Sequence, residues 1–454
     1  MTRLFDSTPV NILQPSSMML ASTLLRLPYE VLERIFDEID SRSLASACLG
    51  SRGIYEIASR NLYGSLLFVI DKPERSDPLY ALKQRPHLAM YTHKVTLRLR
   101  ILSQSDAQHV TKICDYIRTL PSIRRIEWFD NLVRGLHHTA AVGYFLDMLM
   151  DISSSIVELR LPPLWAGNWK PKLMDLRSLR DLTVSHCFPK FGQTLWYRHT
   201  ISNLESLTIS TYLHNAEFLR GACSLRTLKL QSIWSLPQLY PILSELSSLK
   251  HLSMLIDTQH LQNWTPAGTK SPTFTGLECL ELALTPYGLK NFCRSGLFAF
   301  IRSLIAEVES LQEVQISSQR PGCYIDCGNE ISGILVRKYR HSLRLLALDA
   351  MRLQSEALAR ICQQCPNLEV LGFIYADTDL DSTALSAILN LSPMLKTLRL
   401  TVVNVSLSMV VSIMSQDAIR LRKILLRTTQ LMAYFVLESR WTYDPELRSL
   451  KREI

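Results

Sequence analysis

The six-residue stretch LRTLKL at residues 225–230 decides the fold of this 454-residue chain. Its three leucines follow the pattern L-x-x-L-x-L, which recurs along most of the sequence when other apolar residues are allowed at the same positions. The first apolar residue of each copy stands at positions 123, 156, 179, 204, 225, 249, 277, 311, 343, 368, 395 and 421. An imperfect earlier copy contains Val95, Leu97 and Leu99. So many copies in register are not a chance match.

The spacing of the copies indicates leucine-rich repeats. The steps between residues 123 and 421 average about 27 residues, inside the ~20–29 residue period of that repeat class. Alternate side chains of a strand share one face, and between copies apolar residues recur at helical spacing, as in Leu358, Ile361 and Cys365. One strand and one helix cannot bury their apolar faces alone, whereas stacked copies can. The sequence therefore predicts an α/β solenoid, a curved parallel sheet lined by helices, over residues 95–430.

The residues between the buried strand positions are predicted to form one continuous concave surface. Its middle is small and polar, and residues 345–374 contribute an apolar patch. The last two strands add three basic residues, Arg399, Lys423 and Arg427. We expect this end to bind an acidic or phosphorylated segment, because arginine forks match such oxyanions. The alternative is a solvated rim that has no partner.

Two tryptophans, Trp165 and Trp169, occupy an irregular insertion near Pro162 and Pro163. Insertions of repeat proteins map to loops, often on the binding face. The two side chains are therefore further candidates for partner contact, although packing is the simpler role for them.

The N-terminal part of the chain has a different pattern. Residues 1–22 are polar and read as a flexible leader, and residues 23–70 carry apolar residues at the spacing of three short helices. Residues 71–94 are predicted to form a linker helix. At the other end, residues 431–454 read as a C-terminal cap or tail with a charged, helix-like segment.

The helical segment resembles an F-box. The residues that carry the resemblance are Leu27-Pro28-x-Glu30-Val31-Leu32-x-x-Ile35-Phe36, Leu44, Cys48, Ser51-Arg52-x-x-Tyr55 and Leu62-Tyr63. Together with the repeats, they make the chain similar to fungal F-box/leucine-rich-repeat proteins. The resemblance implies that the segment docks on a Skp-family adaptor of a cullin–RING (SCF-type) ubiquitin ligase, and that the repeats select a protein substrate. Carried over, the docking contacts are Leu27, Pro28, Leu32, Ile35 and Leu44. A plain N-terminal cap on the solenoid is the alternative.

Composition narrows the remaining possibilities. The net charge of +9 is spread along the chain without a basic block, which disfavours nucleic acid and is compatible with acidic protein partners. Neither a secretory signal nor an apolar run long enough for a membrane span is recognisable, so we expect a cytoplasmic or nuclear protein. The ten cysteines are then expected to be reduced thiols.

No catalytic motif is recognisable, and we expect neither an active site nor a cofactor. The pairs Cys323–Cys327 and Cys362–Cys365 have a spacing that suggests zinc, but Cys365 fits the buried face of a helix, so buried thiols are the favoured interpretation. The adjacent His137 and His138 lack companion ligands in the sequence. The sequence thus favours a non-catalytic substrate receptor of a ubiquitin ligase. A repeat scaffold unconnected to ubiquitin is the first alternative, and a nucleic-acid-associated regulator is a weaker one.

Overall fold

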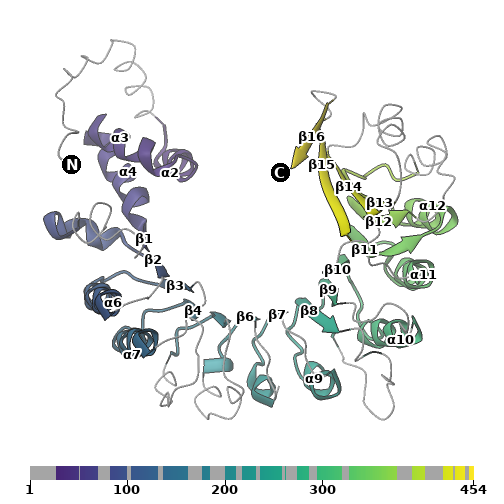
Figure 1. Ribbon diagram of the computed structural model, residues 1–454, viewed down its shortest axis with the longest axis horizontal. Coiled ribbons are helices and arrows are strands. Elements are labelled where there is room, and N and C mark those ends of the chain that lie inside the picture. The colour runs from purple at the N-terminus through teal and green to yellow at the C-terminus, as the bar shows by residue number, and fades with distance from the viewer. Residues whose placement is uncertain are drawn as a thin grey trace. The chain divides into compact units, whose positions relative to one another are not determined.

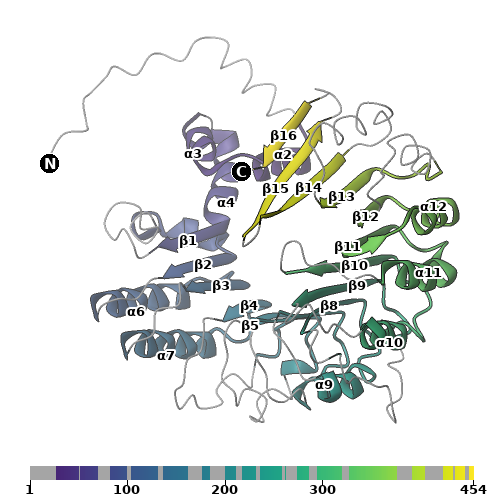
Figure 2. The ribbon, with the colours of Figure 1, turned by 45° about the vertical axis from the view of Figure 1, so that its right-hand side comes forward.

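The computed structural model is shown in Figures 1 and 2. It describes residues 27–50, 52–69, 82–99, 104–130, 136–161, 176–184, 200–210, 217–231, 236–257, 261, 274–285, 294–319, 327–375, 391–403, 423–432, 435–444 and 449–453. The chain divides into two compact units, Met1–Pro162 and Pro163–Ile454, and each is described by itself.

The first unit begins with three short helices that share a small core. Helices α2 (Tyr29–Asp37), α3 (Ser41–Gly50) and α4 (Arg52–Gly64) follow one another with very short connections. Apolar residues at helical spacing bring one stripe of each helix inward. The buried side chains are Leu32, Phe36, Leu44, Ile54, Ile57 and Ala58.

A proline and an aspartate stand where the first two helices begin. The carbonyl of Pro28 accepts hydrogen bonds from the backbone N–H groups of Val31 and Leu32, at 3.0 and 3.1 Å. The carboxylate of Asp40 accepts from the backbone N–H groups of Arg42 and Ser43, at 2.9 and 3.1 Å. The bonds to Pro28 are the first intrahelical bonds of α2, whereas the side chain of Asp40 caps N–H groups that have no partner inside α3. Proline and aspartate therefore fix the starts of α2 and α3.

A parallel sheet follows in the same unit. Strands β1 (Ser65–Val69), β2 (Lys94–Leu99), β3 (Arg125–Asp130) and β4 (Glu158–Leu161) pair side by side in chain order. Helices α6 (Gln104–Arg118) and α7 (Leu136–Asp151) connect the later strands and cover one face. On that face the ring of Trp128 packs edge-on against Phe145 of α7, with 4.7 Å between ring centroids.

The second unit continues the same architecture. Strands β5 to β14 pair in parallel and in chain order, which the repeated pattern predicts. Their bounds are Asp181–Val184, Ser206–Ile209, Thr227–Leu230, His251–Asp257, Cys279–Thr285, Glu313–Ser318, Leu345–Leu353, Val370–Tyr375, Thr397–Val403 and Lys423–Met432. The apolar pair of each described repeat up to Leu398 and Leu400 is buried. The prediction of an α/β fold with a repetitive parallel sheet is therefore confirmed.

Helices cover one face of this sheet as well. The described helical segments are η4 (Glu217–Gly221), α9 (Leu236–Leu243), α10 (Arg294–Leu304), α11 (Gly328–Tyr339) and α12 (Ser355–Gln364). In Figure 1, α9 to α12 all lie on the same side of the strands. The predicted helix at residues 355–365 is confirmed, with Leu358, Ile361 and Cys365 buried.

Two features differ from the expectation. Strand β1 lies inside the range predicted for the helical module, so parallel pairing begins before residue 95. Within residues 431–454, the predicted helix-like segment is wrong, because β15 (Phe435–Asp444) and β16 (Ser449–Glu453) extend the sheet by antiparallel pairing. The predicted linker helix coincides in part with a 3₁₀ helix, η1 (Pro86–Tyr91).

Candidate interaction surfaces

The helical module exposes an unusual share of apolar side chains. Leu27 is 37% exposed, Tyr29 and Val31 are each 40% exposed, and Leu49 is 89% exposed. Pro28, beside Leu27, is also exposed. Three of the ten large exposed hydrophobic residues in the described chain therefore belong to α2 and α3, and a fourth, Leu27, directly precedes α2. Apolar exposure concentrated on a small element is typical of a contact surface.

The five predicted docking residues differ in their exposure to solvent. Leu27 and Pro28 stand at the start of α2 and are open to solvent, and Ile35 is half-buried. Leu32 and Leu44 are buried in the module's own core, so they hold the helices together and offer little surface to a partner. The exposed part of the predicted docking set is therefore Leu27 and Pro28, with Val31 and Leu49 as additions.

Arg60 ties α2 and α4 to the segment that enters the sheet. Its guanidinium donates to the hydroxyl of Tyr29 at 2.7 Å and to the carboxylate of Glu56 at 2.8 Å. The same group lies 5.8 Å from the ring centroid of Tyr29 and 5.6 Å from that of Tyr91. Close packing also joins α4 to this segment, since a Cβ on Gly64 would approach the ring of His93 to 2.9 Å.

The open face of the first unit's sheet carries a network of opposite charges. Glu127 accepts from Arg125 at 2.6 Å and pairs with Lys94 at 3.1 Å, while Arg125 also reaches Glu158 at 2.7 Å. Partial burial alone would raise the pKa of Glu127. Hydrogen bonds from Arg125 and Lys94 outweigh that effect, and the pKa of this carboxyl is lowered. The acidic and basic side chains of this network therefore neutralise one another.

Beside this network an aromatic ring lies between two arginines. The guanidinium carbon of Arg160 lies 3.9 Å from the ring centroid of Phe129, and that of Arg98 lies 6.0 Å from it. The Nε of Arg160 is buried and has no hydrogen-bond partner. Stacked guanidinium groups of this kind keep their outer N–H donors available for an anion.

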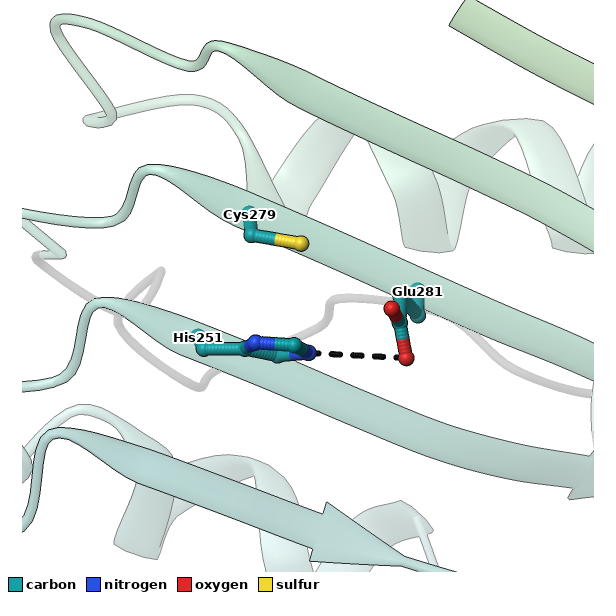
Figure 3. A group of neighbouring side chains, drawn as sticks. All are labelled: His251, Cys279 and Glu281. Atoms are coloured by element: carbon teal, nitrogen blue, oxygen red, sulfur yellow. Dashed lines mark ion pairs between the residues drawn. The ribbon is translucent and has the colours of Figure 1, made fainter. Parts of the chain in front are cut away.

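The open face of the second unit brings together a histidine, a cysteine and a carboxylate (Figure 3). His251 of β8 is the register partner of Cys279 of β9, and Glu281 follows two residues later on the same face. Potential ligand atoms of the three side chains all lie within 4.8 Å of one another. The Nε2 of His251 lies 3.4 Å from Oε2 of Glu281. This is the one such group of metal-ligating side chains in the part of the chain that the structure describes.

The surroundings hold the carboxylate charged and the thiol protonated. The hydrogen bond with His251 lowers the pKa of Glu281 despite partial burial, and Ser253 and Lys229 add to the effect. Burial raises the pKa of Cys279 to about 12, and Glu281 and Glu313 contribute to that rise. Without a bound cation, Cys279 is therefore a thiol beside two carboxylates.

The predicted basic end of the surface is described in part. Arg399 of β13 is half-buried and donates to the amide oxygen of Gln315 at 3.5 Å. Lys423 and Arg427 lie on β14, in register with Thr397 and Thr401, and their side chains fall outside the described residues. The three basic positions are thus on neighbouring strands, as predicted.

Arg399 reaches Gln315 across two strands because the residues between them are small. In the same row stand Ala347 and Gly372, and a Cβ on Gly372 would approach Oδ1 of Asp349 to 2.6 Å. The apolar patch predicted at 345–374 is present only in part, since Leu345 and Val370 are half-buried on the open face. Ala347 and Ile374 are buried, and only part of that region remains open.

The tryptophans and cysteines singled out in the sequence are partly described by the structure. Trp165, Trp169 and Cys323 lie outside the described residues. Cys327, Cys362 and Cys365 are buried, as expected, and burial raises the pKa of Cys362 to about 12 and of Cys365 to about 11. No helix among the described residues combines the length and apolar character that a membrane crossing requires.

The sequence contained a signal for the His251–Cys279–Glu281 group that is easy to overlook. Each residue occupies an outward strand position, and His251 and Cys279 occupy equivalent positions of consecutive repeats. Repeat equivalence places them side by side although 28 residues separate them in the chain.

Comparison with known proteins assigns no family, since no family model and no curated protein matches this sequence.

Proposed function

We propose that this protein is a non-catalytic adaptor of the F-box/leucine-rich-repeat type. Its helical module would dock on a Skp-family adaptor of a cullin–RING ubiquitin ligase, and the open face of its sheet would bind a protein target. The observation that carries the proposal is the exposure of Leu27, Pro28 and Val31 at the start of α2, and of Leu49 on α3, in a module that already has a closed core. Exposed apolar residues beside a complete core support a role in binding.

The open sheet face supports the second half of the proposal. One face of each sheet is covered by helices, while the other presents half-exposed polar and charged residues from successive strands. Repeat proteins use such extended faces for binding. The adaptor would act by position, since tethering raises the local concentration of target lysines near the conjugating enzyme.

The rival function is a repeat scaffold in which α2–α4 serve only as a cap. A cap needs apolar residues only where it covers the first strand, and that role gives no reason for Leu27, Val31 and Leu49 to remain exposed. The large exposure of Leu49 and the openness of Leu27 therefore favour docking over capping.

A co-purification experiment tests the proposal. The full chain, its Leu27→Ala/Pro28→Ala variant and a Val31→Asp variant are mixed with a recombinant Skp-family adaptor. A Leu391→Ala variant is the matched control, since Leu391 is comparably exposed and lies outside the module. We expect the control to bind like the wild type and the module variants to bind at least about tenfold more weakly. A wild-type chain that does not retain the adaptor would leave the scaffold function as the better explanation.

A further inference from the structure

We propose that His251, Cys279 and Glu281 form a zinc-binding site on the open face of β8 and β9 (Figure 3). This site is additional to the adaptor function and does not depend on it. Its residues face away from the helices, on the surface proposed to meet the target.

The backbone provides the geometry. Parallel pairing sets His251 opposite Cys279, and the two-residue period of a strand returns Glu281 to the same face. Tetrahedral zinc, with bonds of about 2.0–2.3 Å, holds its ligand atoms roughly 3.5 Å apart. The atoms here are already within 4.8 Å of one another, and one pair is at 3.4 Å. Side-chain rotations alone can close the remaining distance, because the strands fix the Cα positions.

The donor set selects the metal. One imidazole nitrogen, one sulfur and one carboxylate oxygen are the ligand types that zinc combines in proteins. Magnesium and calcium prefer oxygen ligands throughout, so they fit this group poorly. Three protein ligands leave one coordination position for a further group.

Glu313 is placed to take part. It is the register partner of Cys279 on β10, so the two side chains lie on the same face of the sheet. Glu313 is exposed, so its side chain is free to turn toward a metal held by the other three residues. If it stays in place, the fourth position is open to water or to a side chain of a bound partner.

The electrostatics also favour a cation. The carboxylates of Glu281 and Glu313 stand beside the half-buried thiol of Cys279, and the Nε2 of His251 lies 3.4 Å from Glu281. A zinc ion would accept the lone pair of that nitrogen and form a bond to the Cys279 sulfur as the thiol proton leaves to solvent. The ion, the thiolate, Glu281, Glu313 and the nearby Lys229 would together be formally neutral. A zinc ion would therefore balance the negative charge that the side chains bring together at this point of the sheet.

The test uses the full-length chain after removal of metal with a chelator and dialysis. Zinc uptake is followed by competition with a chromophoric chelator, and Co²⁺ serves as a spectroscopic substitute. Cys279→Ser and Glu281→Gln remove single ligands with little change of shape. Cys223→Ser is the matched control, since Cys223 is an exposed thiol of the same unit. Far-ultraviolet circular dichroism verifies that each variant is folded.

We expect one zinc ion per chain and a thiolate-to-cobalt charge-transfer band. Cys279→Ser should abolish the band and weaken zinc binding by at least about 100-fold, since even outer-shell changes at metal sites cost 10–100-fold. Glu281→Gln should weaken binding while keeping the band, and this variant decides the question if Cys279→Ser does not fold. Cys223→Ser should leave both unchanged.

Three results would overturn the assignment: no stoichiometric zinc uptake, equal affinity in Cys279→Ser and Cys223→Ser, or a cobalt spectrum that lacks the thiolate band. Metal uptake is measured on the isolated chain. Its failure therefore says nothing against the adaptor proposal, and failure to bind a Skp-family adaptor says nothing against the zinc site.

Discussion

The open faces of the two units use the same backbone geometry for different chemistry. In the first unit, Glu127 lies between Lys94 and Arg125, so long charged side chains neutralise one another. In the second unit, His251 and Cys279 stand in equivalent positions beside Glu281, and the potential ligand atoms of the three side chains lie within 4.8 Å of one another. The inward residues are apolar in both. The repeat therefore constrains the buried positions and leaves the outward positions free to vary.

The largest effect on stability should come from the substitution of an inward-facing residue, compared with the substitution of its outward-facing neighbour. Trp128 is fully buried against Phe145, whereas Phe129 on the same strand faces outward. Trp128→Ala should lower the free energy of unfolding by about 3–5 kcal/mol, because it removes a large buried ring and leaves a cavity. Phe129→Ala should cost clearly less. Urea unfolding followed by circular dichroism measures both, and equal losses would break the distinction between the two faces.

Zinc should slow hydrogen exchange in the second unit and leave exchange in the first unit unchanged. A ligand at 100 times its dissociation constant stabilises the bound state by about 2.7 kcal/mol. Backbone amides of β8 to β10 that exchange through opening of the site should therefore exchange up to about 100-fold more slowly with zinc. Amides of β2 to β4 should not change. Hydrogen exchange followed by mass spectrometry makes this comparison within one sample, and uniform protection of both units would point to non-specific metal binding.

A smaller effect is expected from the charge network. The lowered pKa of Glu127 means that its contribution to stability is fully present above its ordinary pKa of about 4.5 and is lost as the pH falls through the lower, folded-state value. Glu127→Gln should therefore cost about 1 kcal/mol near neutral pH and progressively less in acid. Thermal unfolding between about pH 3 and 7 would reveal this convergence. A cost independent of pH would assign the effect to packing instead.

The smallest effect should come from an isolated surface pair. Lys250 and Glu278 are 2.7 Å apart in the second unit, and both side chains are about half exposed. Lys250→Met should change the free energy of unfolding by less than about 0.5 kcal/mol, because solvent and salt screen such pairs. Measured together with Glu127→Gln, this variant shows whether a network on an open face is worth more than a single pair.

The sequence was sufficient for the repeated elements because each depends on a local pattern. Leu228 and Leu230 are two residues apart, and that spacing alone commits them to one face of a strand. The helical spacing of Leu358, Ile361 and Cys365 likewise predicts the burial of Cys365. Strand β1 was harder, since Leu66 and Phe68 form a single alternation directly after a helix, and nothing nearby repeats it.

What the sequence could not give depends on contacts between repeats. Ala347 looks exposed by alternation, yet Arg399 and Asp349 come from other positions and crowd the same surface. The His251–Cys279 pairing likewise depends on register, which a single strand does not encode. Leu32 and Leu44 were assigned to docking by resemblance, and only the packing of three helices reveals that they are inside.

The antiparallel ending of the sheet has a consequence for solubility. A row of parallel strands leaves unpaired backbone groups on its last member, and such an edge can recruit a strand from another molecule. Here β15 and β16 occupy that position, and β16 spans only Ser449–Glu453, with Lys451, Arg452 and Glu453 in succession. A short, highly charged border is a poor template for further strand addition. Where β16 is the outermost strand, as it is among the described strands, it therefore discourages edge-to-edge aggregation at this side of the sheet.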